Sequence, residues 1–389
     1  VKKKTGKSVS LFSGKGGVGK TITTLNLAGI YETLGKKVLI MAGGTGGHVF
    51  PALAIANELK NQGVQILWLG TRGRMEEQLV PKYGFDIEYI NVSGVRRNGI
   101  KVLLKAPFKI VHAIYQALNV VKKFKPDVVL GMGGYASGPG GVAAKLLGIP
   151  LVLHEQNAAA GMTNKLLFKI SNQVLLGFEG AFTGKKVTVI GNPVRKSIID
   201  LHQKQRDFNH SPIKIAIVGG SLGARALNEI VPLALKDFKK EEITVTHQCG
   251  KGNSEKVKQL YSNVEFDYQA TDFIDDMEKL YENHDLIICR AGALTVAEVS
   301  CAGIPAIFVP LPTAVDDHQT LNAKSLQDKG AAIICPQATL TAESLYETVK
   351  ALVLDHDKLA QMSKQAYLCA HTDATLKAVA IIESQVKEK

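Results

Sequence analysis

The chain has 389 residues, 46% of them hydrophobic and 21% charged, which is enough apolar material for two ordinary globular domains. Its formal net charge of +12 at pH 7 favours an acidic partner, namely nucleic acid, an anionic membrane surface or a phosphorylated substrate. Five cysteines without a C-x-x-C pair, and no apolar run near the roughly 20 residues that span a bilayer, argue against disulfides, a zinc site, a spanning helix and an export signal.

The first predicted elements are a strand, a glycine-rich loop and a helix. Residues 14–21 satisfy the phosphate-loop pattern G-x-x-x-x-G-K-[ST], in which backbone amides hold phosphates and the lysine adds a point charge. With its additional Lys15, the segment resembles the deviant Walker A loop of the MinD/ParA ATPases over about the first 40 residues. That family has acidic strand ends further on, where this chain has Met-Ala-Gly-Gly at residues 41–44. We therefore interpret residues 1–36 as a MinD/ParA-like strand–loop–helix appendage.

This appendage keeps the residues of a vestigial ATP site but lacks the carboxylates that would hold magnesium, so we expect weak nucleotide binding at most. These residues are Lys15, Gly19, Lys20 and Thr21. A nucleotide-driven ATPase of the MinD/ParA type stays open as the alternative function.

The first of three further glycine-rich turns, residues 43–48, lies between a strand at residues 37–40 and a helix. The apolar residues of this helix recur at helical spacing from Ala52. Four glycines surround Thr45, and the turn ends in His48, whose side chain titrates near neutrality. Backbone amides at such a helix N-terminus favour anions and sugar oxygens. We interpret the turn as a binding site, with a tight strand-to-helix connection as the alternative.

Strands and helices alternate from residue 37 onward, as in a parallel sheet covered by helices. Among them, residues 93–109 combine bulky apolar side chains with five cations and no acid. This stretch is either a solvated helix start with a core face, or a patch whose apolar side chains enter acyl chains while its cations meet anionic headgroups. The residues of the predicted membrane patch are Arg96, Arg97, Ile100, Lys101, Leu103, Leu104, Lys105, Phe108 and Lys109.

Two more predicted strands are followed by residues suited to a binding site. The strand at residues 126–130 runs into a glycine-rich turn that contains Tyr135, and the next strand ends in His-Glu-Gln-Asn at residues 154–157. Because the carboxyl ends of parallel strands meet at one edge of a sheet, these residues should face the same crevice as residues 43–48. Arg195 follows later and suits a phosphate or a carboxylate.

The chain repeats this plan in its second half. A strand at residues 213–218 ends in a third glycine-rich turn at residues 219–225. A later strand leads into residues 290–298, where amides at a helix N-terminus suit a diphosphate. One turn into that helix, the carboxylate of Glu298 can accept hydrogen bonds from a ribose diol.

Two Rossmann-like parallel-sheet domains that face a cleft resemble the GT-B architecture of sugar-nucleotide glycosyltransferases. We predict an N-terminal domain at residues 37–200, a linker at 201–212, a C-terminal domain at 213–370 and a C-terminal helix at 371–389. The glycine turns and polar strand ends also follow one another as in the MurG family, which are N-acetylglucosaminyltransferases of peptidoglycan synthesis. The resemblance covers about residues 37–389, and the six motifs together are specific. They lie at residues 43–52, 133–139, 154–157, 191–195, 219–221 and 290–298.

The resemblance implies that UDP-N-acetylglucosamine (UDP-GlcNAc) is the donor and lipid I, undecaprenyl-pyrophosphoryl-MurNAc-pentapeptide, the acceptor, with lipid II as the product. In that family Ile274 would meet the uracil, Glu298 the ribose and Ser221 the diphosphate. Leu222 stands where the family commonly has glutamine, so a polar contact is lost there. The implied substrate-binding residues are Thr45, Gly46, Gly47, Asn157, Arg195, Ser221, Ile274, Ala293, Leu294, Thr295, Val296, Ala297, Glu298, Gln319 and Asn322.

The implied reaction is a single displacement that inverts the anomeric carbon, and it needs a base for the acceptor hydroxyl. We predict His48 as that base or as a positioning group, with orientation of the diphosphate or of the turn as its alternative role. Tyr135 and Glu155 are second candidates. Helix N-termini can stabilise departing UDP without a metal, so we expect no required cofactor and a divalent metal ion that is at most accessory.

A membrane-anchored acceptor would explain the basic excess, because the enzyme must then dock on an anionic leaflet. The resemblance implies a peripheral enzyme on the cytoplasmic face of the bacterial plasma (inner) membrane. No recognition helix or set of stacking aromatic residues points to nucleic acid.

Overall fold

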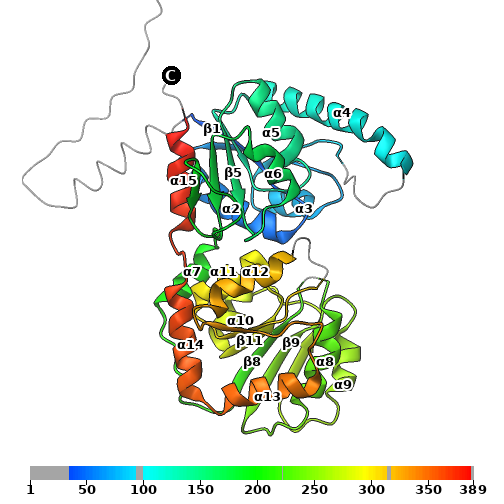
Figure 1. Cartoon of the computed structure of the whole chain (residues 1–389), viewed down its shortest axis with the longest axis vertical. Helices are drawn as coiled ribbons and strands as arrows, with labels where there is room; N and C mark the ends of the chain where they lie inside the picture. The colour runs from blue at the N-terminus through cyan, green and yellow to red at the C-terminus, as the bar shows by residue number, and fades with distance from the viewer. Residues whose placement is uncertain (1–34, 93–99, 221, 313–316, 387–389) are drawn as a thin grey trace, which may run out of the picture.

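The computed structural model of the chain describes residues 35–92, 100–220, 222–312 and 317–386, without the side chains of residues 100–106 and of Gln203. The predicted phosphate loop, Arg96, Arg97 and Ser221 lie outside the described residues. Two α/β domains stand one above the other along the long axis of the molecule (Figure 1). Each is a parallel sheet with helices on both faces.

The N-terminal domain is built on a seven-stranded sheet with the order β3-β2-β1-β4-β5-β6-β7, and all neighbouring strands are parallel. Its strands are β1 (Lys37–Met41), β2 (Gln65–Gly70), β3 (Asp86–Tyr89), β4 (Val128–Gly131), β5 (Leu151–Glu155), β6 (Gln173–Leu176) and β7 (Val187–Val189). Its helices are α2 (Gly46–Asn61), α3 (Met75–Lys82), α4 (Ile100–Phe124), α5 (Ser137–Leu146) and α6 (Met162–Phe168).

The C-terminal domain is built on a six-stranded parallel sheet with the order β10-β9-β8-β11-β12-β13. Its strands are β8 (Ile213–Val218), β9 (Ile243–Gln248), β10 (Tyr268–Thr271), β11 (Leu286–Cys289), β12 (Ala306–Phe308) and β13 (Ala332–Ile334). Its helices are α8 (Arg225–Leu235), α9 (Ser254–Leu260), α10 (Met277–Asn283), α11 (Ala293–Ala302), α12 (His318–Gln327), α13 (Ala342–Val353) and α14 (His356–Leu368).

The apolar strands explain why both sheets are covered on two sides. In β1, Val38 and Ile40 belong to the core cluster on one face of the sheet, and Leu39 and Met41 belong to the cluster on the other face. All four side chains are buried. A strand that is apolar at every position, rather than at alternate positions, therefore specifies a central parallel strand between two layers of helices.

The strand order reverses direction between β1 and β4 in the first sheet and between β8 and β11 in the second. At the first reversal, Met41 is level with Gly131, and at the second, Val218 is level with Cys289. The glycine-rich turns at residues 43–48, 133–139 and 219–225 and the segment at residues 290–298 follow these four strand ends. Ligands of open α/β sheets bind in the crevice at such switch points, so the topology brings the predicted site residues together.

Two segments connect the domains. The chain passes through α7 (Lys196–Ile199) and the 3-10 helix η1 (Asp200–Gln203) into the C-terminal domain. At its other end, helix α15 (Ala374–Ser384) returns from α14 and packs beside α2 (Figure 1). Ala378, Val379 and Ile382 of α15 belong to the core of the N-terminal domain. The GT-B fold class predicted from the sequence, two Rossmann-like domains facing one another, is thus confirmed, and its predicted appendage lies outside the described residues.

Candidate active site

The first glycine turn is shaped by a buried carboxylate that the sequence analysis missed. Glu76 in α3 is fully buried, and its Oε2 accepts a hydrogen bond from the Gly44 backbone N–H at 2.9 Å. Its Oε1 accepts from the backbone N–H and the hydroxyl of Thr71, at 3.1 and 2.8 Å. A Cβ on Gly43 would lie 2.3 Å from that same Oε1, so only glycine fits there. Glu76 therefore fixes the path of the turn that leads to His48.

The second glycine turn lies directly against the first. Gly133 and Gly134 both have positive φ, of 92° and 87°. A Cβ on Gly134 would lie 2.5 Å from the Gly43 carbonyl oxygen, and one on Gly133 would lie 2.7 Å from Cδ2 of His48. The structure thus brings together the two turns that the sequence placed at one edge of the sheet, with the His48 imidazole against Gly133.

His48 is a partly buried side chain in the first turn of α2, with its Nδ1 3.3 Å from the Thr45 hydroxyl. Burial lowers the pKa of His48 below its ordinary value, although the charges of Glu155 and Glu76 and the Gly43 carbonyl oppose the shift. His318, from α12 of the other domain, lowers the pKa of His48 further. The imidazole is therefore neutral at physiological pH, which is the form that accepts a proton.

Glu155, a second candidate for catalysis, is occupied by its own loop. Its Oε1 accepts hydrogen bonds from the backbone and side-chain amides of Asn157, at 3.1 and 3.3 Å. Its Oε2 accepts from the Gly161 backbone at 2.9 Å and from the Asn164 side chain at 2.8 Å. With both oxygens engaged and the residue 2% exposed, the carboxylate holds the loop that presents Asn157.

Tyr135, the other second candidate, is 42% exposed, and the guanidinium of Arg74 lies over its ring at 5.5 Å. Its hydroxyl is therefore accessible to an acceptor substrate, and its part in catalysis stays a prediction.

The C-terminal domain contributes the N-terminus of α11. Gly292 precedes this helix with extended backbone angles, and no side chain caps the first turn. The amides of the first turn, which belong to predicted donor-binding residues, are therefore not used by a cap and can meet an anion. Glu298 follows one turn later and is buried.

The Glu298 carboxylate is held by two side chains, one from α10 and one from the start of the segment that connects the domains. Oε2 accepts a hydrogen bond from the Tyr281 hydroxyl at 3.0 Å, and Oε1 lies 3.3 Å from Nη2 of Arg195. Burial raises the pKa of Glu298, while Arg195 and the Tyr281 hydroxyl lower it in part. Nε of Arg195 has no hydrogen-bond partner among the described residues, and its guanidinium lies over the Phe50 ring at 5.4 Å.

A second bridge between the domains joins two predicted substrate-binding residues. Asn322 of α12 is fully buried, and its Nδ2 donates to Oδ1 of Asn157 at 3.3 Å. Its own Oδ1 accepts a hydrogen bond from the Ala158 backbone at 2.9 Å. Gln319, one turn earlier in α12, accepts a hydrogen bond from the Leu311 backbone at 2.9 Å. The two domains are therefore in contact at the predicted site, through residues expected to hold the sugar.

A cavity of about 660 Å³ lies between the domains, within the size range of small-molecule pockets. Its lining includes Ala158 and Asn192 from the N-terminal domain and Val296 and Ala297 of α11. Ile274, predicted to meet the uracil, is partly buried against the C-terminal core. Leu222, in the third glycine turn, is 90% exposed.

The part of the predicted membrane patch from Ile100 to Lys109 lies on α4, whose N-terminal end projects from the domain (Figure 1). Ala113, Ala117 and Val121 on one face of this helix are buried. On another face, Phe108, Val111 and Tyr115 are strongly exposed, with Lys109 also at the surface. The exposed apolar stripe therefore extends beyond the residues predicted from the sequence. No helix within the described ranges is long and apolar enough to cross a membrane.

Two glycine turns lie at one switch point and a third lies at the opposed one. Together with a helix N-terminus for an anion and a buried carboxylate beside it, they define a GT-B sugar-nucleotide glycosyltransferase. The chain belongs to glycosyltransferase family 28. Residues 38–176 match the family's N-terminal domain and residues 214–381 its C-terminal domain.

Named relatives share this whole region. The chain is 55% identical to a protein of Tolumonas auensis over 347 residues, covering 87% of this chain and 97% of the relative, and 53% identical to one of Shewanella sp. (strain MR-4) over 344 residues, covering 88% and 95%. Both are named UDP-N-acetylglucosamine--N-acetylmuramyl-(pentapeptide) pyrophosphoryl-undecaprenol N-acetylglucosamine transferase.

The crystal structure of MurG from Acinetobacter baumannii superposes with a TM-score of 0.77 at 44% identity, covering 90% of this chain and 99% of that one. The glycosyltransferase of kitacinnamycin superposes with a TM-score of 0.66 at 16% identity, with 90% and 99% covered, which shows the shared fold. The resemblance to the MurG family drawn from the sequence motifs is confirmed.

Proposed function

We propose that this chain transfers N-acetylglucosamine from UDP-GlcNAc to the muramyl hydroxyl of lipid I, producing lipid II for peptidoglycan synthesis. The observation that carries the proposal is the contact between the two switch points, where His48 stands on one side and Glu298 on the other. The relatives that share more than half of the residues over nearly their full length carry this activity in their names.

The donor lies mainly on the C-terminal domain in this proposal. The first-turn amides of α11 receive the diphosphate, and Glu298 accepts hydrogen bonds from the ribose hydroxyls. Gln319 and Asn322 turn toward the sugar when the donor displaces the protein contacts they make now. Arg195 then faces the diphosphate, for which its unpartnered Nε is suited.

The chemistry follows from the neutral imidazole of His48. The muramyl hydroxyl gives its proton to His48 as its oxygen forms a bond to the anomeric carbon, and the bond from that carbon to the UDP oxygen breaks on the opposite face. UDP leaves with the electron pair and is stabilised by the α11 amides, so a divalent metal ion is at most accessory. The proton on His48 then passes to solvent.

The enzyme reaches its lipid acceptor from the cytoplasmic face of the membrane, as a peripheral protein. The exposed stripe of Phe108, Val111 and Tyr115 enters the interface, and the neighbouring lysines meet anionic headgroups. A groove of about 490 Å³ beside this stripe, lined in part by Phe108 and His112, adds apolar surface next to it. The basic net charge thus serves a lipid surface, with no nucleic-acid partner.

The deciding experiment is incorporation of label from UDP-GlcNAc into a soluble lipid I analogue. Transfer that depends on both substrates supports the proposal, and no transfer by folded protein would refute it. For docking, flotation with anionic liposomes should be lost in a Lys101→Glu, Lys105→Glu, Lys109→Glu variant. Glutamate at Lys236, Lys251 and Lys256, exposed on the other domain, is the charge-matched control and should leave flotation unchanged.

A further inference from the structure

Tyr281 is a buried tyrosine in α10 that neither the sequence motifs nor the predicted donor site includes. Its ring belongs to the core cluster between the sheet and α11, and it is 1% exposed. Its hydroxyl donates the 3.0 Å hydrogen bond to Oε2 of Glu298. One oxygen of the Glu298 carboxylate is thus tied to the rigid core, while Oε1 points to Arg195 of the segment that connects the domains.

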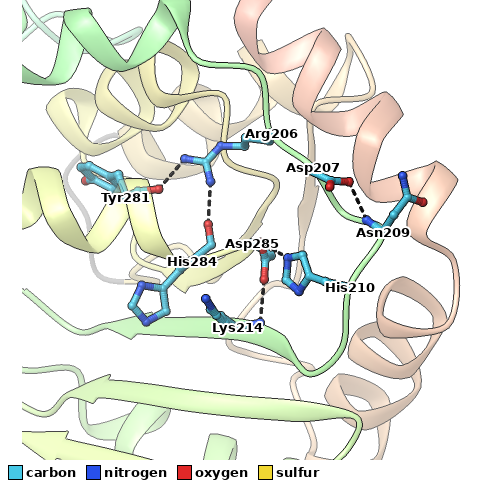
Figure 2. A network of polar contacts seen from close by, with 8 residues as sticks. All are labelled: Arg206, Asp207, Asn209, His210, Lys214, Tyr281, His284 and Asp285. Atoms are coloured by element: carbon cyan, nitrogen blue, oxygen red, sulfur yellow. Dashed lines mark hydrogen bonds and ion pairs between the residues drawn. The ribbon is translucent and has the colours of Figure 1, made fainter.

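Arg206 ties together the helices that carry this pair, and Figure 2 shows its contacts with Tyr281 and His284. This largely buried guanidinium donates through Nη1 to the His284 carbonyl at 2.6 Å and through Nη2 to the Tyr281 carbonyl. Its Nε donates to the carbonyl of Ala302, the last residue of α11, at 2.9 Å. One side chain therefore bridges the C-terminal ends of α10 and α11, which fixes Tyr281 relative to Glu298.

We propose that Tyr281 is a positioning residue for the donor's ribose, because its hydroxyl, 3.0 Å from Oε2, holds the Glu298 carboxylate in the orientation that faces the ribose diol. The inference rests on the proposed function, in which Glu298 accepts hydrogen bonds from that diol. An ionised carboxylate is an acceptor only, so both hydroxyls of the diol can donate to it. A buried carboxylate without fixed donors would be neutral more often and free to change its orientation.

The groups around Glu298 and Tyr281 are compatible with the Tyr281 hydroxyl as a lasting hydrogen-bond donor to Glu298. Arg195 comes from the segment before α7, Tyr281 from α10 and Cys301 from the same helix as Glu298, while Cys289 of β11 lies near Tyr281. Burial raises the pKa of Tyr281 and of both thiols, so all three stay neutral at physiological pH. The Tyr281 hydroxyl is therefore a permanent donor, and Arg195 supplies the facing charge.

The test compares Tyr281→Phe with Tyr261→Phe. Tyr261 is an equally buried tyrosine of the same domain whose hydroxyl bonds to His247 rather than to the donor site. Both variants lose one buried hydroxyl. In Tyr281→Phe we expect the KM for UDP-GlcNAc to rise about tenfold, as for loss of a hydrogen bond to a charged group, with kcat nearly unchanged. Tyr261→Phe should change neither constant.

A donor analogue separates positioning from a general loss of structure. With 2′-deoxy-UDP-GlcNAc, which lacks one ribose hydroxyl, Tyr281→Phe should raise KM much less than with UDP-GlcNAc. The low-pH inflection of kcat/KM for UDP-GlcNAc should also move to higher pH in this variant, because Glu298 loses a donor that favours its ionised form. Equal effects on both donors, or no effect on either, would overturn the proposal.

Transfer by the wild-type enzyme from the two donors separates a failure of the proposed function from a failure of the role given to Tyr281. Absence of transfer from UDP-GlcNAc would refute the proposed function itself, and transfer without discrimination against the 2′-deoxy donor would refute the ribose role of Glu298 and with it the role of Tyr281. Discrimination that Tyr281→Phe leaves intact would refute the positioning role alone. Should Tyr281→Phe fail to fold, 3-fluorotyrosine at position 281, a stronger donor, should move the inflection to lower pH, and an unmoved inflection overturns the proposal.

Discussion

Glu76 and Glu155, two buried carboxylates of the N-terminal domain, contrast with Glu298 of the C-terminal domain. Glu76 and Glu155 together accept seven hydrogen bonds, all from donors of the N-terminal domain itself. Among the described residues, Glu298 accepts from two side chains, Tyr281 of α10 and Arg195 of the segment that connects the domains. The first two carboxylates shape their own domain, and in the proposed function the third binds the donor.

This difference bears directly on the choice of base. A carboxylate whose oxygens are both engaged by backbone and side-chain donors is not free to approach an acceptor hydroxyl. Among the candidates of the N-terminal domain, His48 alone combines a neutral imidazole at physiological pH with a place against the second glycine turn. The comparison therefore supports the proposal of His48 as the proton acceptor and of Glu298 as a donor-binding residue.

The largest expected effect is that of His48→Ala. Removal of a general base lowers kcat by about 10² to 10⁴-fold, while the KM for UDP-GlcNAc should stay within about threefold of wild type. The measurement is steady-state transfer to a lipid I analogue, with UDP affinity as the folding control. Near-normal turnover would remove His48 as the base and leave Tyr135 as the next candidate.

The sequence predicted the parts of this site that local patterns determine, namely the turns that follow the apolar strands. Glycine-rich segments after apolar strands identified three of the turns, because parallel strands bring their carboxyl ends to one edge. The order of the strands then brought Gly43 against Gly134, a contact that leaves no room for a Cβ on Gly134. Pattern and topology agreed, so residues 91 positions apart could be placed together without a structure.

The residues that the sequence did not predict are those whose roles depend on contacts with residues far away in the sequence. Glu76 holds Gly44 across 32 residues, and Arg206 reaches Ala302 across 96. Neither carries a motif, since any helix can contain a glutamate and any polar linker an arginine. For the same reason residues 201–212 read as a simple linker, whereas Arg206 anchors that segment to the C-terminal domain (Figure 2).

Glu76→Gln should have the next largest effect, and it should fall on stability. The side chain keeps its volume, but only its amide oxygen can accept, so either the Gly44 amide or the two Thr71 donors lose their acceptor. A buried donor without a partner costs about 1–3 kcal/mol. We expect a loss of about 3 kcal/mol in the free energy of unfolding, measured by denaturant titration. An unchanged unfolding free energy would contradict the idea that this carboxylate shapes the turn.

Glu298→Gln, the matched change in the other domain, should leave stability within about 1 kcal/mol, because the Arg195 side chain is 34% exposed and water can solvate its charge once the carboxylate is gone. Its effect should appear in the donor KM, which we expect to rise about 10- to 100-fold as charge-assisted hydrogen bonds to the ribose weaken. Steady-state kinetics with varied UDP-GlcNAc measures this. A variant that instead loses stability and keeps its KM would reverse the assigned roles of the two carboxylates.

The smallest effect is on the pH profile of kcat. The neutral imidazole is the active form, and burial lowers the pKa of His48 below its ordinary 6.5, so turnover should fall only as the pH drops through that lowered value. At pH 6.5 the rate should exceed half of its plateau. His318 of the other domain contributes to the lowering, so His318→Gln should move the inflection to higher pH. Since this contribution acts only while α12 stays near the first glycine turn, an unmoved inflection would mean that the two switch points separate before the proton is transferred.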